Sequence, residues 1–212
     1  GLLAAAGRRV MLVDLDPHAS LTAYFGRDPD AQAIGMYDLF IEHKRLTKEA
    51  VLRASCPTSE PNLRFLPGQV ALATLEKQLA GQDGVGLIVQ RICQLMVADI
   101  DDVLLDCPPV LGVLMVNALA ACDALLIPVQ TEFLALHGLD RMLRTLTMVE
   151  RSRGGPIFHR IIPTMFDRRT RASVGALRHL RDSHGDLVWR AVVPVDTRLR
   201  EASQQHLTPA QF

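Results

Sequence analysis

Apolar runs of strand length, separated by segments with helical spacing, constrain the fold of this chain more than any other feature. The runs occupy residues 10–15, 63–66, 103–105, 124–129, 157–163 and 188–193. Segments such as VLLD and ALLIPV show little polar alternation, which is typical of strands covered on both faces. Strands separated by helices favour parallel pairing. We therefore expect an α/β fold, with a doubly wound, mostly parallel sheet and helices on both faces.

The segments between these runs have the apolar spacing of helices. Helices are expected at residues 69–79, 85–97, 131–150, 171–181 and 196–206, with shorter ones in LTAYFG, MYDLFIEH and LTKEAVLRA. The opening GLLAAAGRRV has the pattern of the end of a helix. No shift in composition marks a boundary within the 212 residues, and no repeat is visible. We therefore expect a single domain over residues 1–212.

Composition excludes several classes of protein. With 49% hydrophobic and 22% charged residues, the chain lies outside the range of disordered proteins. The longest apolar stretch, residues 113–129, contains Asn117 and Asp123 and falls short of the roughly 20 apolar residues of a membrane-spanning helix. The four cysteines are widely spaced and form no CxxC pair. This spacing favours a reducing, cytoplasmic location.

The net charge is zero, yet its sign changes along the chain. Residues 1–140 contain 10 Lys and Arg against 17 Asp and Glu, a balance of −7, whereas residues 141–212 contain 13 against 6, a balance of +7. All 13 basic residues of the second part are arginines. Arginine binds phosphate in a bidentate manner, so this part predicts a phosphate-binding face, with a solvated arginine-rich surface as the alternative.

Two of the expected strands end in aspartate. VMLVDLDPH places Asp14 and Asp16 at alternate positions at the end of one strand, and DDVLLDCPP places Asp106 at the end of another. Ligands bind beyond the carboxyl ends of strands in open parallel sheets, and acids from two such ends can hold Mg²⁺ together with water and phosphate oxygens. Helix capping is the alternative for both motifs. One acid of the first pair would then cap a helix near Ser20, and Asp106 would be the N-cap of another helix.

Four segments, in this order, carry a specific resemblance: RVMLVDLDPHASLTAYFG, DVLLDCPPVLGVLMVNALAACDALLIPVQTEFLALHGL, IIPTMFDRRT and VPVDTRLREAS. They are similar to the ParA/MinD family of deviant-Walker P-loop ATPases, in particular to its ParA (Soj) branch and to the ParA-like proteins encoded with chemotaxis systems. The resemblance covers nearly the whole chain. It implies ATP and Mg²⁺ as cofactors, a homodimer, and nonspecific DNA or a polar protein as the track.

The sequence departs from the family pattern at three places. His18 stands where the family usually has glutamine, and Cys107 stands where it has a small or apolar residue. The phosphate loop of the family, KGGVGKT, would precede Gly1, and GQDGVG supplies no substitute because it lacks the lysine and the Ser/Thr that enter a helix. We expect the first strand and the phosphate loop to be missing, either because the sequence is a fragment, which we favour, or because the protein is a degenerate member.

The resemblance also implies roles for individual residues. Asp16 matches the acid that positions the attacking water and senses the γ-phosphate, and would be catalytic. Asp14 and Asp106 match acids of the metal shell, Asp106 being the Walker B acid. The nucleotide-binding residues nearest the base are expected to be Thr164, Met165, Phe166, Asp167, Pro194, Val195 and Asp196. DNA-binding residues are expected on one face of the helix over residues 171–181, at Arg171, Arg178 and Arg181.

These features predict an ATPase switch that positions DNA or a polar protein assembly by ATP-dependent dimerisation. The cargo implied is a chromosome, a plasmid or a chemoreceptor array, and the protein partner is a ParB-like or polar chemotaxis protein. Two alternatives stay open at this point. One is a positioning adaptor of the same fold that does not hydrolyse ATP. The other is a biosynthetic ligase or amidotransferase of the same P-loop superfamily.

Overall fold

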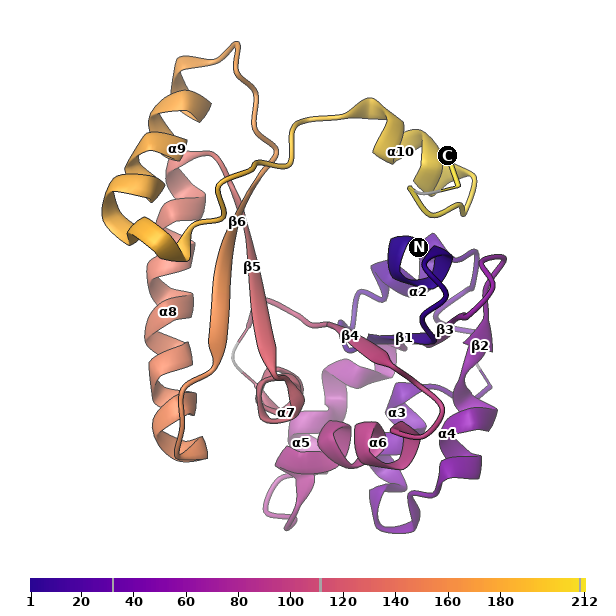
Figure 1. Ribbon diagram of the computed structural model, residues 1–212. Helices are drawn as coiled ribbons and strands as arrows, with labels where there is room; N and C mark the ends of the chain where they lie inside the picture. Colours follow the sequence, from indigo (N-terminus) through magenta and orange to yellow (C-terminus); the bar gives the residue numbers. More distant parts are fainter. Residues whose placement is uncertain (32, 111, 210) are drawn as a thin grey trace. The chain divides into compact units, whose positions relative to one another are not determined.

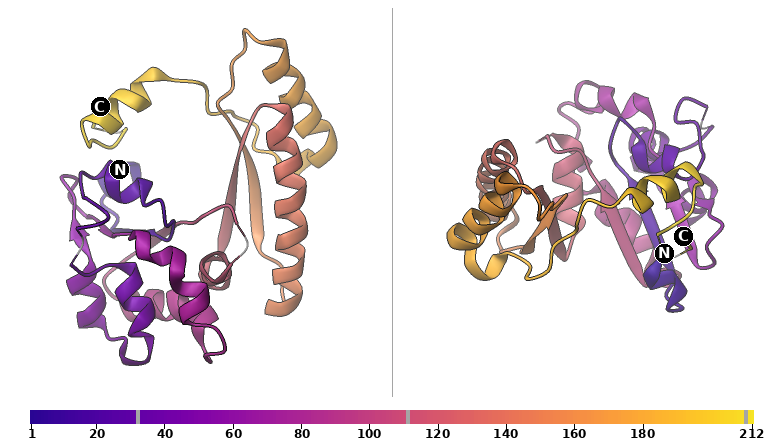
Figure 2. Two further views of the ribbon diagram at one scale, coloured as in Figure 1. Left: turned by 180° about the vertical axis from the view of Figure 1, so that it is seen from behind. Right: turned by 90° about the horizontal axis from the view of Figure 1, so that it is seen from above.

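The computed structural model describes residues 1–31, 33–110, 112–209 and 211–212. The chain divides into two compact units. Unit 1 comprises Gly1–Ala121 together with Arg198–Phe212, and unit 2 comprises Cys122–Thr197. Figures 1 and 2 show the helices and strands of each unit. The expectation of a single domain over the whole chain stays a prediction.

Unit 1 contains a four-stranded sheet in the order β2-β3-β1-β4. Its strands are β1 (Val10–Asp14), β2 (Cys56–Pro57), β3 (Leu63–Leu66) and β4 (Asp102–Asp106). β1 pairs in parallel with β3 on one side and with β4 on the other, and the short β2 pairs antiparallel with β3. The sheet is therefore mostly parallel, as the sequence predicts.

Helices cover both faces of this sheet because the side chains of β1 alternate between two apolar clusters. Met11 and Val13 are completely buried in the larger cluster, and Val10 lies in a smaller cluster with Ala4 and Leu63. The helices and 3₁₀ turns of the unit are α1 (Leu2–Ala5), α2 (Ser20–Tyr24), α3 (Met36–Ile41), η1 (His43–Arg45), α4 (Lys48–Ala54), η2 (Val70–Thr74), α5 (Leu75–Gln78), η3 (Val85–Leu87), α6 (Ile88–Met96), α7 (Val113–Ala121) and the larger part of α10 (Thr197–Gln204).

The C-terminal segment belongs to unit 1 because it is bonded to the end of α2. The Tyr24 hydroxyl donates to the carbonyl of Leu207 at 2.7 Å, and Nδ1 of His206 lies 2.8 Å from the carbonyl oxygen of Tyr24. Each contact joins residues more than 180 positions apart in the chain. The last helix is thereby tied to the beginning of the sequence.

Asn117 is a completely buried polar residue that fixes the start of α6. Its Oδ1 accepts from the backbone N–H groups of Ile88 and Val89, and its Nδ2 donates to the carbonyls of Val85 and Val113 at 2.7 and 2.8 Å. The helix expected over residues 85–97 accordingly begins as the 3₁₀ turn η3, and its α-helical part starts at Ile88. A polar residue in an apolar stretch here satisfies the free N–H groups of a neighbouring helix.

Unit 2 is a parallel pair of strands packed against two long helices. β5 (Ala124–Gln130) pairs with β6 (Phe158–Thr164) along their whole length, and the helices are α8 (Phe133–Arg153) and α9 (Arg171–His184), followed by the turn η4 (Gly185–Leu187). The core joins Ile127 and Ile161 of the strands to Leu139 of α8 and Leu180 of α9. Figure 1 shows both strands running alongside α8.

The expected strand over residues 188–193 is wrong. Isolated bridges and single backbone hydrogen bonds, such as that from the Val193 N–H to the Pro163 carbonyl at 2.8 Å, join this region to β6 without forming a continuous ladder. The backbone bends at Arg190 and the next residue, which interrupts regular pairing. The helix expected over residues 69–79 is also broken, because it forms the 3₁₀ turn η2 and then the short α5.

No helix within the described ranges combines the length and apolar character needed to cross a membrane.

Candidate functional site

Asp14, the last residue of β1, is completely buried and fixes the helix that follows. Its Oδ2 accepts hydrogen bonds from the Thr22 backbone N–H at 2.9 Å and from the Thr22 hydroxyl at 2.7 Å. Its Oδ1 accepts one from the backbone N–H of Asp16 at 3.2 Å. Thr22 is the third residue of α2, so Asp14 satisfies an N–H that a helix leaves free in its first turn. The capping contact weighed for one acid of this pair is made by Asp14.

Gly68, which follows β3, completes this buried network. Its N–H donates to the Thr22 hydroxyl oxygen at 2.8 Å. A Cβ atom at this position would lie only 2.8 Å from Cγ of Asp14, so a side chain here requires the acid to move. The ends of β1 and β3 and the first turn of α2 are therefore held together by one carboxylate, one hydroxyl and one backbone N–H.

Asp16 lies just beyond the end of β1 and is held through a single oxygen. Its Oδ1 accepts from the backbone N–H of His18 at 2.9 Å and lies 2.9 Å from Nδ1 of the same residue. The Asp16 side chain is 22% exposed, whereas that of His18 is 87% exposed. The histidine that replaces the usual glutamine thus contacts the acid expected to be catalytic. The other carboxylate oxygen of Asp16 is in no hydrogen bond found among the described residues.

Asp106 ends β4 directly beside the end of β1. The register of the two strands pairs Asp14 with Asp106, and the backbone N–H of Leu15 donates to the Asp106 carbonyl at 2.8 Å. Partial burial of its carboxyl raises the pKa of Asp106, and the charges of Asp14 and Asp16 raise it further. Burial also raises the pKa of Asp14, against the lowering effect of its bonds to Thr22. The acids of the two strand ends are close enough to repel one another, as expected for an acidic site at this edge of the sheet.

The three acids differ in how well they suit a magnesium ion. The oxygens of buried Asp14 are surrounded by protein donors, whereas Asp106 is more exposed and its repulsion from its neighbours would be relieved by a cation. Within the described ranges no three His, Cys, Asp or Glu side chains form a ligand cluster. Magnesium keeps several waters and needs only one or two carboxylates. The donors present fit an ion held mainly by water and phosphate, and Asp106 is the carboxylate better placed for it. Metal roles for Asp14 and Asp106 stay predictions.

In unit 2, four of the seven residues expected near a nucleotide base line one cavity of about 370 Å³. The backbone N–H of Phe166 donates to Val193, and the N–H of Val195 donates back to Phe166, both at 3.1 Å. These bonds bring together the loops after β6 and before α10. The cavity is lined by Phe166, Asp167, Pro194 and Val195, together with Arg168 and Arg169.

The three other expected base-side residues are placed around this cavity and do not line it. Thr164 ends β6, and its carbonyl accepts from the backbone N–H of Thr131 at 3.1 Å. Met165 is 44% exposed and has a positive φ of 52°, a conformation that non-glycine residues seldom adopt. Asp196 is exposed and immediately precedes α10.

Asp167 is held in place by a fork from Arg169. Nε and Nη2 of Arg169 donate to the two carboxylate oxygens at 2.9 and 2.8 Å, and these hydrogen bonds are the main reason why the pKa of Asp167 falls to about 2. The backbone N–H of Asp167 donates to the hydroxyl of buried Ser173, whose Oγ lies 2.6 Å from that of Thr131. The loop after β6 is therefore fixed to the start of α9.

The three arginines expected to bind DNA lie on exposed positions of α9, but they divide between two pockets. Arg171 and Arg178 line a cavity of about 240 Å³ with Arg168 and Arg169. Arg181 lies one turn beyond Arg178 and lines a different, larger cavity. The expected face thus contains a basic cluster around Arg171 and Arg178 that does not include Arg181.

Sequence reasoning missed Thr22, Gly68 and Asn117, which position the acids and the helices beside them. Thr22 and Gly68 lie next to an expected strand or helix end, and Asn117 is a polar residue inside an apolar stretch; these are the signals that could have indicated a cap or a close backbone approach. The identity of the partner residues could not be read from spacing, because Gly68 lies 46 positions from Thr22.

Parallel strands that end in acids, one of them bonded to the first turn of a helix, are typical of α/β proteins that bind a ligand at this edge of the sheet. A family profile described as an AAA domain matches residues 1–155. The sporulation initiation inhibitor protein Soj of Bacillus subtilis is 31% identical over 201 residues, which cover 94% of this chain and 78% of that protein. The chromosome partitioning protein ParA of Caulobacter vibrioides is 32% identical over 203 residues, which cover 94% and 74% of the two chains.

A crystal structure of cobyrinic acid a,c-diamide synthase from Mycobacterium smegmatis, with bound ADP and magnesium, is also similar. It is 32% identical, with a TM-score of 0.81, over 96% of this chain and 80% of that chain. The chain belongs to the ParA/MinD family of P-loop ATPases, because the profile match and the Soj and ParA relatives agree over most of its length. The resemblance of the sequence motifs to this family and to its ParA (Soj) branch is confirmed.

Proposed function

We propose that the protein is a ParA-type ATPase that positions DNA or a polar protein assembly by forming a homodimer when it binds ATP. The proposal rests on one observation above all: β1 and β4 are paired in parallel and end together in acids, within a chain that is 32% identical to a chromosome partitioning protein. Chromosomes, plasmids and chemoreceptor arrays are the candidate cargoes, and a ParB-like or polar chemotaxis protein is the candidate partner.

The acids of unit 1 would act by position and charge. Bound ATP would supply the phosphoanhydride bond, and its Mg²⁺ would offset part of the phosphate charge. Asp16 orients the attacking water through its Oδ2, since its contacts with His18 engage Oδ1 alone. Asp106 would hold water of the metal shell, because it is more exposed than Asp14 and lies beside it at the ends of the paired strands. Asp14 sets the position of Asp16 by accepting its backbone N–H.

The cavity around Phe166 and Pro194 suits the base side of the nucleotide. Its volume of about 370 Å³ falls in the range of small-molecule sites, roughly 300–1,000 Å³. Phe166 and Val195 present apolar surface there, and Asp167 is kept ionised and fixed by Arg169.

DNA binding is proposed for the exposed arginines of α9. Arg171 and Arg178 line one basic cavity, and such residues neutralise phosphates without reading sequence. A double substitution to alanine should weaken retardation of arbitrary duplex DNA and make the logarithmic salt slope less steep by about 1.8, since each lost phosphate contact contributes about 0.9. Arg45 and Arg53, both exposed in unit 1, form the matched control pair, whose substitution should leave the slope unchanged.

The decisive experiment separates ATP binding from ATP hydrolysis in the gene product that contains this chain. Asp16→Ala should bind MgATP with nearly unchanged affinity and hydrolyse it at least tenfold more slowly, because one positioned group typically contributes about 10²–10⁴-fold. Asp106→Ala should instead weaken binding that depends on Mg²⁺. Asp30→Ala removes an exposed carboxylate from the same unit and should change neither quantity. Equal loss of binding in the Asp16 and Asp106 variants would contradict this division of roles.

Two alternative functions, an amide-forming enzyme and an adaptor, would each give a different result in assays of ATP hydrolysis. The neighbour described as a cobyrinic acid a,c-diamide synthase favours an ATP-dependent amide-forming enzyme as the second candidate. Hydrolysis stimulated by duplex DNA would support the partition function, and hydrolysis stimulated only by glutamine together with a carboxylic acid substrate would support the synthase. A protein that binds MgATP and dimerises without hydrolysing it would be the adaptor.

A further inference from the structure

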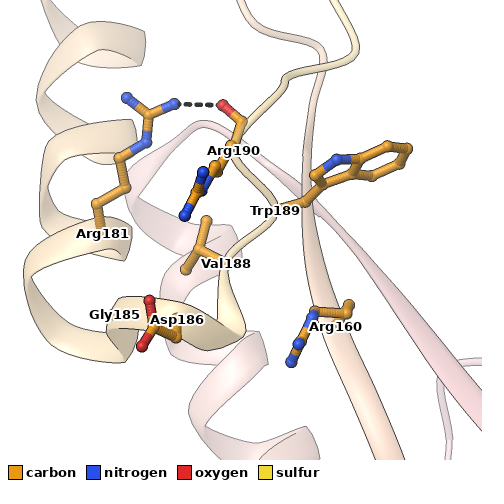
Figure 3. Close-up of a pocket in the computed structure, with 7 residues that line it drawn as sticks. All are labelled: Arg160, Arg181, Gly185, Asp186, Val188, Trp189 and Arg190. Atoms are coloured by element: carbon orange, nitrogen blue, oxygen red, sulfur yellow. Dashed lines mark hydrogen bonds between the residues drawn. The ribbon is translucent and has the colours of Figure 1, made fainter.

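A cavity of about 870 Å³ in unit 2 lies where the chain returns from α9 to run beside β6. Three elements contribute arginines to its lining: Arg160 from β6, Arg181 from the last turn of α9, and Arg190 from the segment after η4. Figure 3 shows Arg181 reaching across to Arg190, with Trp189 on the β6 side of the segment. None of the proposed ATPase acids and none of the expected base-side residues lines this cavity.

Two of the arginines are held in place by contacts that leave their charge available. Nη2 of Arg181 donates to the backbone carbonyl of Arg190 at 2.9 Å. The guanidinium of Arg160 lies 4.7 Å from the centre of the Phe158 ring. The ion pairs found in the described part of the chain include none of the three cavity arginines. Fixed guanidinium groups without a carboxylate partner favour an anionic ligand, because they keep further N–H donors free.

An exposed indole projects from the same segment, on its β6 side (Figure 3). Trp189 is 52% exposed, although its backbone N–H is fixed by a bond to the Ile161 carbonyl at 2.8 Å. The preceding residue, Val188, is buried in the core, so the segment that carries the indole is anchored. Tryptophan and arginine on an anchored surface are the residue types most enriched at the energetic centres of protein interfaces.

Asp186 distinguishes between the two kinds of anionic macromolecule, a nucleic acid and an acidic protein segment, that could bind in this cavity. Its carboxylate lines the same cavity as the arginines. A nucleic acid backbone presents a phosphate at every step and would meet this carboxylate with repulsion. A protein segment can direct Asp or Glu side chains to the arginines and a backbone N–H to Asp186. The mixed lining therefore favours a peptide over a nucleic acid.

We propose that the cavity formed by Arg160, Arg181, Arg190, Asp186 and Trp189 binds an acidic segment of a partner protein. The arginines pair with its carboxylates, and the indole packs against an apolar side chain within it. This interaction does not depend on ATP hydrolysis, and it uses a surface distinct from the basic cavity at Arg171 and Arg178.

Trp189 is the single tryptophan of the chain, so its fluorescence reports on this cavity directly. The probe is a fluorescein-labelled hexapeptide of sequence EEFDEE, titrated with the gene product that contains this chain. Binding is read from the anisotropy of the label, and the tryptophan emission of the protein is read in a parallel titration with unlabelled peptide. We expect saturable binding, a change in Trp189 emission, and an affinity that falls as salt is added. The basic peptide KKFKKK should not bind.

The triple variant Arg160→Ala/Arg181→Ala/Arg190→Ala should bind EEFDEE about tenfold more weakly, since each exposed ion pair contributes roughly 1.5-fold to fivefold. The single variant Arg190→Glu reverses one exposed charge and gives a second measurement if the triple variant is poorly folded by circular dichroism. It should weaken binding at least threefold.

The control variant removes the same number of positive charges, three, from another part of unit 2. The triple variant Arg141→Ala/Arg144→Ala/Arg151→Ala lies on exposed positions of α8 outside this cavity and should keep at least half of the affinity. Absence of EEFDEE binding at low salt would overturn the proposal, as would equal weakening in the two triple variants. Tighter binding of an oligothymidylate than of EEFDEE, with loss in the cavity variant, would assign the cavity to single-stranded nucleic acid and also overturn it.

Discussion

Replacing the Thr22 hydroxyl tests whether the network around Asp14 holds the acidic site together. Thr22→Val keeps the shape of the side chain but removes the group that donates to Asp14 at 2.7 Å and accepts from Gly68 at 2.8 Å. A lost bond to a charged group costs about 1.5–3 kcal/mol, and a buried N–H left without an acceptor costs about 1–3 kcal/mol. We therefore expect the free energy of unfolding to fall by about 3 kcal/mol or more.

The assay is urea unfolding followed by far-UV circular dichroism, together with the thermal midpoint. A loss of about 3 kcal/mol corresponds to a fall of about 6–12 °C in Tm for a chain of this size. Thr22→Ser is the matched control, because it keeps the hydroxyl and removes one methyl group, for about 1 kcal/mol. If the valine and serine variants unfold within about 0.5 kcal/mol of each other, the hydroxyl does not carry the network and the reasoning is refuted.

Three other perturbations have defined outcomes. Asn117→Asp turns an amide that donates to two carbonyls into a carboxylate, which only accepts hydrogen bonds when it is ionised. The urea midpoint should fall by the equivalent of about 2–5 kcal/mol. An unchanged midpoint would contradict the role of Asn117 as a buried cap. The Arg169 fork holds the pKa of Asp167 at about 2. The stabilisation from this pair is therefore fully present above the ordinary pKa of 3.8 and is lost as the pH falls through about 2. In the Arg169→Ala variant, the pKa of the Asp167 carboxyl measured by NMR should return toward 3.8. Leu180→Ala should cost about 2–5 kcal/mol in urea unfolding because Leu180 is completely buried, whereas Leu199→Ala at a 43% exposed position should cost less than about 1 kcal/mol, and equal costs would contradict the assigned core.

The parts of the fold that were predictable are those fixed by local pattern. β1 and β3 lie within one residue of their apolar runs, because a buried parallel strand has a continuous apolar sequence. Residues 188–193 have the same pattern but form no strand, since the backbone bends at Arg190. Apolar character predicts burial, and strand pairing also needs a regular backbone and a free N–H at each step.

The position of the candidate site could be predicted from the sequence, whereas the burial and the hydrogen bonds of each acid could not. The ends of β1 and β4 do meet, as expected for neighbouring parallel strands, and this follows from the fold class alone. That Asp14 is buried against Thr22 depends on Gly68, a residue brought there by β3, and spacing along the chain contains no signal for that contact. The division of Arg178 and Arg181 between two cavities likewise depends on the return of the chain after α9.

Sedimentation velocity with and without ATP and Mg²⁺ tests the proposed switch most directly, using the gene product that contains this chain and its Asp16→Ala variant. ATP should convert both proteins to a dimer. The wild-type protein should return to a monomer as its ATP is consumed, whereas the variant should remain a dimer because it cannot position the attacking water. Sedimentation at the monomer value for both proteins at saturating ATP, or an equally fast return to monomer in the variant, would contradict the assignment of Asp16 and the switch itself.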